Sequence, residues 1–128
     1  MDANEREWIN QLVEKVVGAS YDVANTLGAG FLEKAYKRAL VIELRSRGIR
    51  AESQVPLRVM YKGENGGEYC IDILVESKLV LELKCVQTLI GEHLAQALNY
   101  LKATGKHIAL LINFQRPKVE WRRVVHNF

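Results

Sequence analysis

The sequence predicts one α/β domain over residues 1–128, in which a central mixed β-sheet is flanked by helices. Three observations support this prediction. Helical periodicity fills the first part of the chain, strand-like alternation fills the middle, and one further helical segment precedes the last strands. A helix placed between strands carries the chain across one face of a sheet, which is the connection that parallel strands need.

The composition suits a single globular domain with its own core. The chain has 128 residues, 48% of them hydrophobic, and a formal net charge of +3, which permits a nucleic-acid partner without demanding one. No apolar run approaches the length of a membrane span, and residues 1–7 are too polar for a signal peptide. Alternation puts Cys70 and Cys85 on opposite faces, so we expect no disulfide and a reduced, cytoplasmic protein.

Two amphipathic helices are predicted at the start of the chain. Apolar residues recur at helical spacing over about residues 4–27, and Gly28-Ala29-Gly30 ends this segment because glycine is common just past a helix end. The second helix is predicted over about residues 31–47 and ends at Gly48.

Three strands are predicted in the middle of the chain. Their ranges are 54–61, 71–75 and 79–84, with a turn over 62–67 between the first two. We expect these strands to form an antiparallel meander with the last two at the centre of the sheet.

A third helix and two further strands complete the prediction. Helical periodicity returns over residues 91–104 and ends at Gly105. Residues 107–114 form an apolar run suited to a strand that is buried on both faces, and residues 119–125 alternate again. Helices are therefore expected over both faces of the sheet.

The two central strands carry carboxylates whose relation depends on the loop that joins the strands. If residues 76–78 form a three-residue loop, Val75 pairs with Leu79 and Asp72 lies opposite Glu82. A two-residue loop would shift the register and separate the two carboxylates. We predict the first register.

In this register the central strands present a charged face. Alternation puts Ile71 and Ile73 opposite to the face of Asp72, while Glu82 and Lys84 share a face. Facing carboxylates repel by about 0.2–1 kcal/mol relative to a neutral pair, and burial without partners costs more. A divalent cation bound between the carboxylates would offset both their repulsion and the cost of burying them. Lys84 beside the cation would orient a water or stabilise charge on a phosphoryl oxygen. The alternative is a solvated face with ordinary surface charges.

These segments resemble a known family. Asp72 followed by residues 82–84 (Glu-Leu-Lys) resembles the D…E-x-K core of the PD-(D/E)XK nuclease superfamily. Residues 30–36 fit the G-x-x-E-x-x-Y signature of the GxxExxY protein family, which is related to that superfamily. The likeness runs from about Val17 to Arg123. It implies a restriction-endonuclease-like α/β/α sandwich and a metal-dependent phosphodiesterase.

The resemblance also implies roles for particular residues. Asp72 and Glu82 would bind Mg²⁺ or Mn²⁺, with Glu33 completing the acidic cluster, and Lys84 would assist the attacking water. Ile71 stands where the superfamily's name has a proline, which is commonly absent. Further residues expected to line the substrate site are Gln96, Tyr100 and Tyr36.

Basic residues near the C-terminus are the expected contacts to a nucleic-acid backbone. Arg116 and Lys118 belong to the most basic segment of the chain and are predicted to bind phosphates. No aromatic run interleaved with basic residues indicates a stacking platform for single strands. DNA is expected ahead of RNA as the ligand. Because a short chain offers little surface to grip a duplex, we expect a homodimer or a partner protein.

The sequence leaves two alternatives to a nuclease. One is a non-catalytic nucleic-acid-binding or assembly protein that retains the nuclease fold. The other is a purely structural domain, in which the carboxyl groups of Asp72 and Glu82 would lie more than roughly 7 Å apart, too far to share one ion at Mg²⁺–oxygen distances of about 2.0–2.1 Å. The sequence has neither a phosphate-loop motif nor a zinc-ligand spacing of its cysteines.

Overall fold

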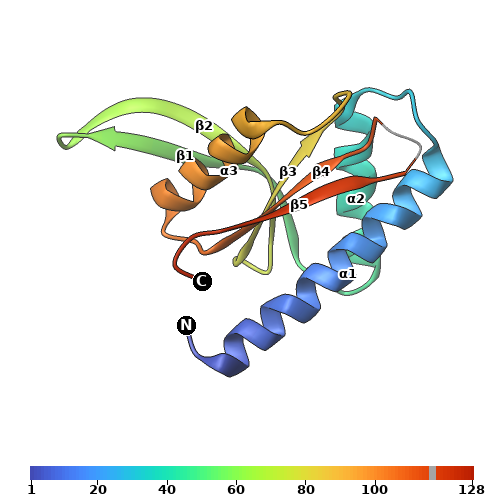
Figure 1. The fold of residues 1–128 in the computed structure, drawn as a ribbon, viewed down its shortest axis with the longest axis horizontal. Coiled ribbons are helices and arrows are strands. Elements are labelled where there is room, and N and C mark those ends of the chain that lie inside the picture. Colours follow the sequence, from blue (N-terminus) through green and yellow to red (C-terminus); the bar gives the residue numbers. More distant parts are fainter. Residues whose placement is uncertain (116–117) are drawn as a thin grey trace.

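A computed structural model describes residues 1–115 and 118–128, and its elements follow the predicted order. In chain order they are α1 (Ala3–Leu27), α2 (Glu33–Ser46), β1 (Ala51–Tyr61), β2 (Glu64–Val75), β3 (Leu79–Lys84), α3 (Gly91–Thr104), β4 (Ile108–Asn113) and β5 (Glu120–Val125). Figure 1 shows α1 running across one side of the molecule and α3 lying beside the sheet. None of the described helices is both long and apolar enough to cross a membrane.

The five strands form one mixed sheet in the order β1-β2-β3-β4-β5. The pair of β3 and β4 is parallel, and the other neighbouring pairs are antiparallel. The parallel pair follows from α3, which carries the chain over one face of the sheet between these strands. This confirms the predicted α/β class with its mixed central sheet, and it places β3 in the middle of the sheet.

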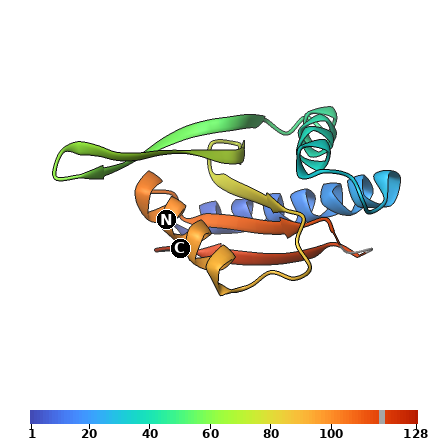
Figure 2. The ribbon, with the colours of Figure 1, turned by 90° about the horizontal axis from the view of Figure 1, so that it is seen from above.

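The sheet separates two hydrophobic cores. In one core α1 and α2 pack against inward-facing residues of the central strands, such as Leu81 and Leu110. In the other core α3 packs through Ala97 and Leu101 against residues such as Val80. Alternation along β3 sends successive apolar side chains to the two faces, which explains why this strand is buried over nearly its whole length. Figure 2 shows the resulting layers, with α1 and α2 on one side of the sheet and α3 on the other.

The register of the central hairpin is the predicted one. Val75 pairs with Leu79, which leaves Glu76, Ser77 and Lys78 as the three-residue loop. Glu76 and Ser77 have φ angles of 52° and 57°, in the left-handed region that tight hairpin loops use.

The predicted alternation fails at Asp72. Ile73 packs in the core under α1 and α2, whereas Ile71 packs in the core under α3, so the two do not share a face as expected. The β1–β2 ladder passes from the pair of Ile73 to the pair of Ile71 with no pair between them. On β1 at this point, Gln54 has a φ of 55°. The backbone is irregular at this point, and Asp72 therefore lies between a residue that faces α1 and α2 and a residue that faces α3.

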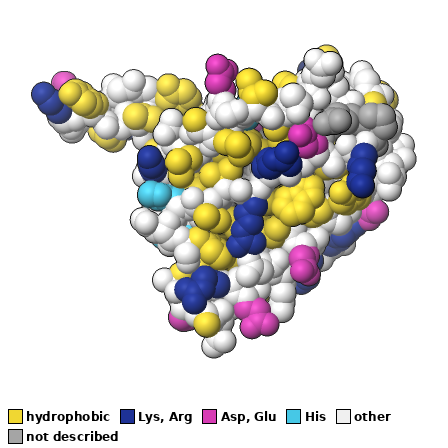
Figure 3. All heavy atoms as spheres, in the orientation of Figure 1, with side chains coloured by type: hydrophobic (Ala, Val, Ile, Leu, Met, Phe, Trp, Pro, Cys, Tyr) yellow, Lys and Arg dark blue, Asp and Glu magenta, His cyan; other side chains and the backbone are white. Residues whose placement is uncertain are grey.

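Strands β1 and β2 extend past the rest of the sheet as a projecting arm (Figures 1 and 2). The predicted turn over 62–67 is too long, because β2 already begins at Glu64 and only Lys62 and Gly63 form the turn. Both have positive φ angles, of 50° and 78°, as a two-residue hairpin turn requires. Figure 3 shows apolar and charged side chains together at the tip of this arm.

The connection between α1 and α2 is held by the buried ring of Tyr36. Its hydroxyl donates a hydrogen bond to the Gly28 carbonyl oxygen (2.6 Å) and accepts one from the Phe31 N–H (3.2 Å). Its ring stacks on Phe114, with centroids 4.9 Å apart. Since Gly30 has a φ of 107°, which side chains other than glycine rarely adopt, the loop closes tightly over this tyrosine and sets the start of α2.

Candidate active site

The candidate active site begins with Asp72 and Glu82, which meet where β2 and β3 separate. The ladder between these strands ends at Ile73 and Leu81. Beyond that point the Asp72 N–H donates to Glu82 Oε1 (3.4 Å), and the Leu83 N–H donates to Asp72 Oδ2 (2.8 Å). Side-chain oxygens thus replace carbonyl oxygens as acceptors between the strands. These two hydrogen bonds place both carboxylates at the same point between the strands.

Glu82 is a buried carboxylate, with only 4% of its surface exposed. The pKa of Glu82 is raised from 4.5 to about 8, and the largest cause is burial, because the charged form loses hydration. The negative charge and the side-chain contact of Asp72 contribute to this rise, while the Asp72 N–H and the charge of Lys84 oppose it. Any positive charge added near this carboxyl would stabilise its charged form and lower its pKa.

Lys37 is the cation that contacts Asp72 directly. Its Nζ lies 3.0 Å from Asp72 Oδ1, and the two side chains are only 15% and 14% exposed. Sequence analysis did not single out Lys37 as a partner of Asp72. Helical spacing could have identified Lys37 as a site residue. It lies one turn after Glu33, the glutamate of the G-x-x-E-x-x-Y signature, and so on the same face of α2.

Lys84 is oriented by two residues of α3 that were expected at the site. Its Nζ donates to Gln96 Oε1 (3.1 Å), and Gln96 Nε2 donates to the Tyr100 hydroxyl (3.3 Å). The ring of Tyr100 also contacts Tyr69 of β2, with centroids 6.0 Å apart. Burial raises the pKa of the Tyr100 hydroxyl, and the charges of Glu82 and Asp72 add to this effect. Lys84, Gln96 and Tyr100 therefore form one hydrogen-bonded chain beside the carboxylates.

Glu33 does not join the carboxylate pair in the structure. Within residues 1–115 and 118–128, no three Asp, Glu, His or Cys side chains gather closely enough to hold a metal ion. Glu33 lies half-buried at the start of α2, where its charge adds to the effect of burial in raising the pKa of the Cys85 thiol. It is thus near the end of β3 and Lys84, but not within a three-ligand cluster.

The remaining expected residues lie apart from this cluster. Tyr36 is 1% exposed and its hydroxyl is engaged by the α1–α2 loop, a placement that supports a structural role and leaves little access for a substrate. Lys118 is exposed before β5 and makes neither a hydrogen bond nor an ion pair with any described residue. Arg116 lies outside the described residues.

Asn113 is a positioning residue that sequence analysis did not single out. It pairs with Lys84 across β3 and β4 and is fully buried. Its amide donates to the Val86 carbonyl oxygen (2.8 Å), and its Oδ1 accepts from the Val86 N–H (3.1 Å). It therefore anchors the segment that follows Lys84. An apolar run ending in asparagine was visible in the sequence, but not the segment that this asparagine would contact.

The donor set of this site fits a magnesium-type ion. Mg²⁺ is commonly bound through one or two carboxylates, with water and substrate phosphate filling its other positions. Asp72 and Glu82 provide two carboxylates. Because burial disfavours the charged form of Glu82, a nearby dication would stabilise that form strongly. The two cysteines do not add a zinc set, because neither belongs to a group of three potential ligands among the described residues.

Replacing Lys37 with methionine should raise the affinity for Mn²⁺ by about fivefold. The substitution keeps the length of the side chain but removes the ammonium that competes for Asp72, and an ion pair of this exposure contributes about 1 kcal/mol. Calorimetric titration with Mn²⁺ measures the change. Lys34→Met, one turn away on α2, is the matched control and should leave the affinity unchanged. Equal or weaker affinity in Lys37→Met would contradict the assignment.

Comparisons with known proteins bear on the family and the fold of this chain. A model of the PD-(D/E)XK nuclease superfamily matches residues 10–124. Among solved structures, the crystal structure of SSO0001 aligns with a TM-score of 0.60 at 16% identity, covering 75% of this chain and 51% of that chain. An alkaline exonuclease (LHK-Exo) from Laribacter hongkongensis aligns with a TM-score of 0.50 at 12% identity, covering 89% and 82%. No match was found among curated proteins.

At these identities the structural matches establish the fold alone, and the chain spans about half the length of SSO0001. The superfamily match is different, because it covers nearly the whole sequence, including Asp72, Glu82 and Lys84. The narrower resemblance carried by residues 30–36 stays a prediction. The agreement of sequence match, sheet topology and clustered residues leads to one conclusion: this chain belongs to the PD-(D/E)XK nuclease superfamily.

Proposed function

We propose that this protein is a metal-dependent nuclease that hydrolyses phosphodiester bonds, with DNA as the expected substrate and RNA as the second candidate. The observation that supports it most is the convergence of two carboxylates and a lysine at the end of β3. There the Glu82 carboxylate accepts the Asp72 N–H, the Asp72 carboxylate accepts the Leu83 N–H, and Lys84 is held beside them by Gln96. A nuclease fold alone would not require this polar cluster in a buried part of the sheet.

The roles of the residues follow from their contacts. Asp72 and Glu82 would hold Mg²⁺ or Mn²⁺, which when bound lowers the pKa of a coordinated water and offsets charge on a phosphoryl oxygen. The Lys84 ammonium is directed by Gln96 and is available to orient the attacking water and to stabilise negative charge that develops on the phosphate. Tyr100 fixes Gln96 through a hydrogen bond, and so fixes the direction of Lys84.

Lys84→Met should reduce cleavage by about 10²–10⁴-fold, the usual contribution of a positioned proton-transfer or charge-stabilising group. The assay incubates the purified protein with Mn²⁺ or Mg²⁺ and labelled duplex, single-stranded and branched DNA and RNA. Mn²⁺ binding by Lys84→Met should be at least as tight as in the wild type, because Lys84 is not a ligand and its positive charge opposes the ion. Lys102→Met, at an exposed position of α3, removes the same charge and should cleave normally.

A non-catalytic nucleic-acid-binding or assembly protein is the alternative function. The observation that favours it is the Lys37–Asp72 ion pair, which gives Asp72 a cationic partner without a metal. Absence of cleavage on every substrate, with Mn²⁺ still bound by the wild type and not by an Asp72 variant, would support this alternative. A homodimer and a cytoplasmic location stay predictions.

A further inference from the structure

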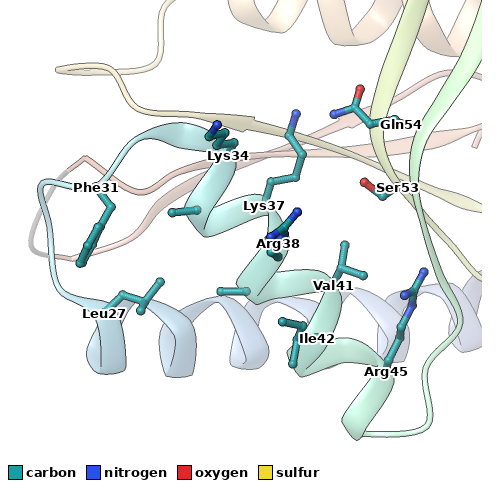
Figure 4. A pocket seen from close by; sticks show the side chains of 12 residues that line it. Leu27, Phe31, Lys34, Lys37, Arg38, Val41, Ile42, Arg45, Ser53 and Gln54 are labelled. Carbon is teal, nitrogen blue, oxygen red and sulfur yellow. The ribbon is translucent and has the colours of Figure 1, made fainter.

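A large groove runs along α2, and Val41, a member of the core under α1 and α2, forms part of its lining. The groove lies between α2, the end of α1 and the start of β1, and has a volume of about 1020 Å³. This is at the upper end of the roughly 300–1,000 Å³ typical of small-ligand pockets. Figure 4 shows Leu27 and Phe31 near the start of α2, Arg45 near its end, and Ser53 and Gln54 on the neighbouring strand.

The charged residues that line the groove are all basic in the described part of the chain. Two of the four are already engaged: Lys37 pairs with Asp72, and Arg45 donates two hydrogen bonds to the Ala51 carbonyl oxygen. The other two, Lys34 and Arg38, are exposed one turn apart on α2 and make no hydrogen bond or ion pair with a described residue. The groove therefore presents two cations that are available to an anionic ligand.

The groove also has apolar surface that is open to solvent. Phe31 is 53% exposed and Ile42 is 62% exposed, and both line it. The Phe31 ring is supported edge-on by Tyr36, with centroids 6.3 Å apart. An exposed, supported ring beside two free cations is the combination that binds unpaired nucleotides, with a base against the ring and phosphates on the cations. Sequence analysis found no such platform because Phe31 is a single ring at the predicted start of the second helix.

The groove leads to the candidate active site. Lys37 lines it and at the same time contacts Asp72. Gln54 also lines it, and lies on β1 at the point where the β1–β2 ladder is interrupted beside Asp72. A chain lying along α2 would therefore pass Lys37 and Gln54, the lining residues that lie next to Asp72. This continuity favours the substrate over an unrelated partner as the occupant.

We infer that the groove along α2 binds a single-stranded segment of the nucleic-acid substrate and guides it to Asp72 and Glu82. Lys34 and Arg38 contact its phosphates, and Phe31 stacks on one of its bases. In a duplex both faces of a base are covered by its neighbours, so only an unpaired strand offers a base to Phe31. This inference rests on the proposed nuclease function, and it adds that the substrate has a single-stranded part.

The test measures binding without cleavage, in EDTA. The probe is a labelled oligodeoxythymidylate of about 12 nucleotides, within the site sizes of roughly 4–16 nucleotides known for single-strand binding folds. A duplex of equal length and a poly-glutamate peptide are the comparison ligands. The variants are Phe31→Leu and the double variant Lys34→Ala/Arg38→Ala. Lys15→Ala/Lys102→Ala removes two exposed charges from α1 and α3 and is the matched control.

We expect the single strand to bind more tightly than the duplex. Phe31→Leu should weaken its binding by about tenfold, near the lower part of the range for one stacked base. The double variant should weaken it and lower the slope of log K against log salt by about 1.4, since each phosphate contact to a single strand contributes about 0.7. The control should have little effect. Thermal melting checks that each variant is folded.

Three results would overturn the inference. They are equal binding of the duplex, an effect of the control as large as that of the groove variants, and preferential binding of poly-glutamate, which would assign the groove to an acidic protein partner. Failure of the proposed function looks different. In that case no substrate is cleaved when metal is supplied, while the groove variants still lose single-strand binding in EDTA.

Discussion

Asp72→Ala is expected to weaken Mn²⁺ binding by more than about 100-fold and to abolish detectable cleavage. Loss of a residue that only supports a ligand costs about 10–100-fold, so loss of one of two carboxylate ligands should cost more. The substitution also leaves the Leu83 N–H without its acceptor and Lys37 without its ion pair, in a part of the sheet with little exposure. We therefore also expect a loss of about 1–3 kcal/mol in the free energy of unfolding.

Asp72→Asn separates these two effects. Its amide oxygen can still accept the Leu83 N–H, so stability should stay closer to that of the wild type, while the missing charge should still weaken the metal site. Calorimetric titration with Mn²⁺ and chemical denaturation measure the two quantities side by side. Wild-type Mn²⁺ affinity in Asp72→Asn would remove Asp72 from the ligand set.

Without metal, the protein is expected to become less stable as the pH rises from about 5 to about 8. The pKa of Glu82 is about 8 in the folded state, whereas the ordinary value for an exposed glutamate carboxyl is 4.5. Between these values the folded state holds a proton that the unfolded state has lost, so the free energy of unfolding falls with pH. The slope is at most about 1.4 kcal/mol per pH unit, and the total loss is on the order of 3 kcal/mol.

Glu82→Gln should remove this pH dependence. Glutamine is neutral at every pH and retains an oxygen for the Asp72 N–H, so the variant should exceed the wild type in stability at pH 9. Urea denaturation in EDTA over pH 5–9 measures the slopes, and Mg²⁺ added at pH 8–9 should restore stability to the wild type alone. Parallel pH profiles for the two proteins would show that another group carries the effect.

The fold was predictable because its elements are set by local periodicity. The segment over residues 91–104 shows helical spacing, ends at a glycine and forms α3 with the same bounds. The three-residue loop follows from where two apolar runs stop, and it determines the register between β2 and β3. Errors occurred where backbone geometry departs from the regular pattern, as at the two-residue turn of Lys62 and Gly63 and at the change of faces around Asp72.

The candidate site was predictable only in part. Asp72, Glu82 and Lys84 lie on adjacent strands, so sequence spacing and register suffice to bring them together. Gln96 lies on α3, and its contact with Lys84 depends on how the helix packs on the sheet. The family resemblance pointed to this glutamine, whereas spacing along the chain did not indicate which partner it would meet.

What the chain encodes locally is therefore the succession of elements, the central hairpin and the pair of facing carboxylates, since each depends on residues close in sequence. The partners of those carboxylates depend on packing between distant segments. Lys37 reaches Asp72 because α2 lies over the sheet, and Asn113 anchors the chain after Lys84 because β4 runs parallel to β3. Hydrophobic periodicity predicts which face of a helix is buried. It does not predict which buried charge that face will contact, because the contact depends on how the helices pack on the sheet.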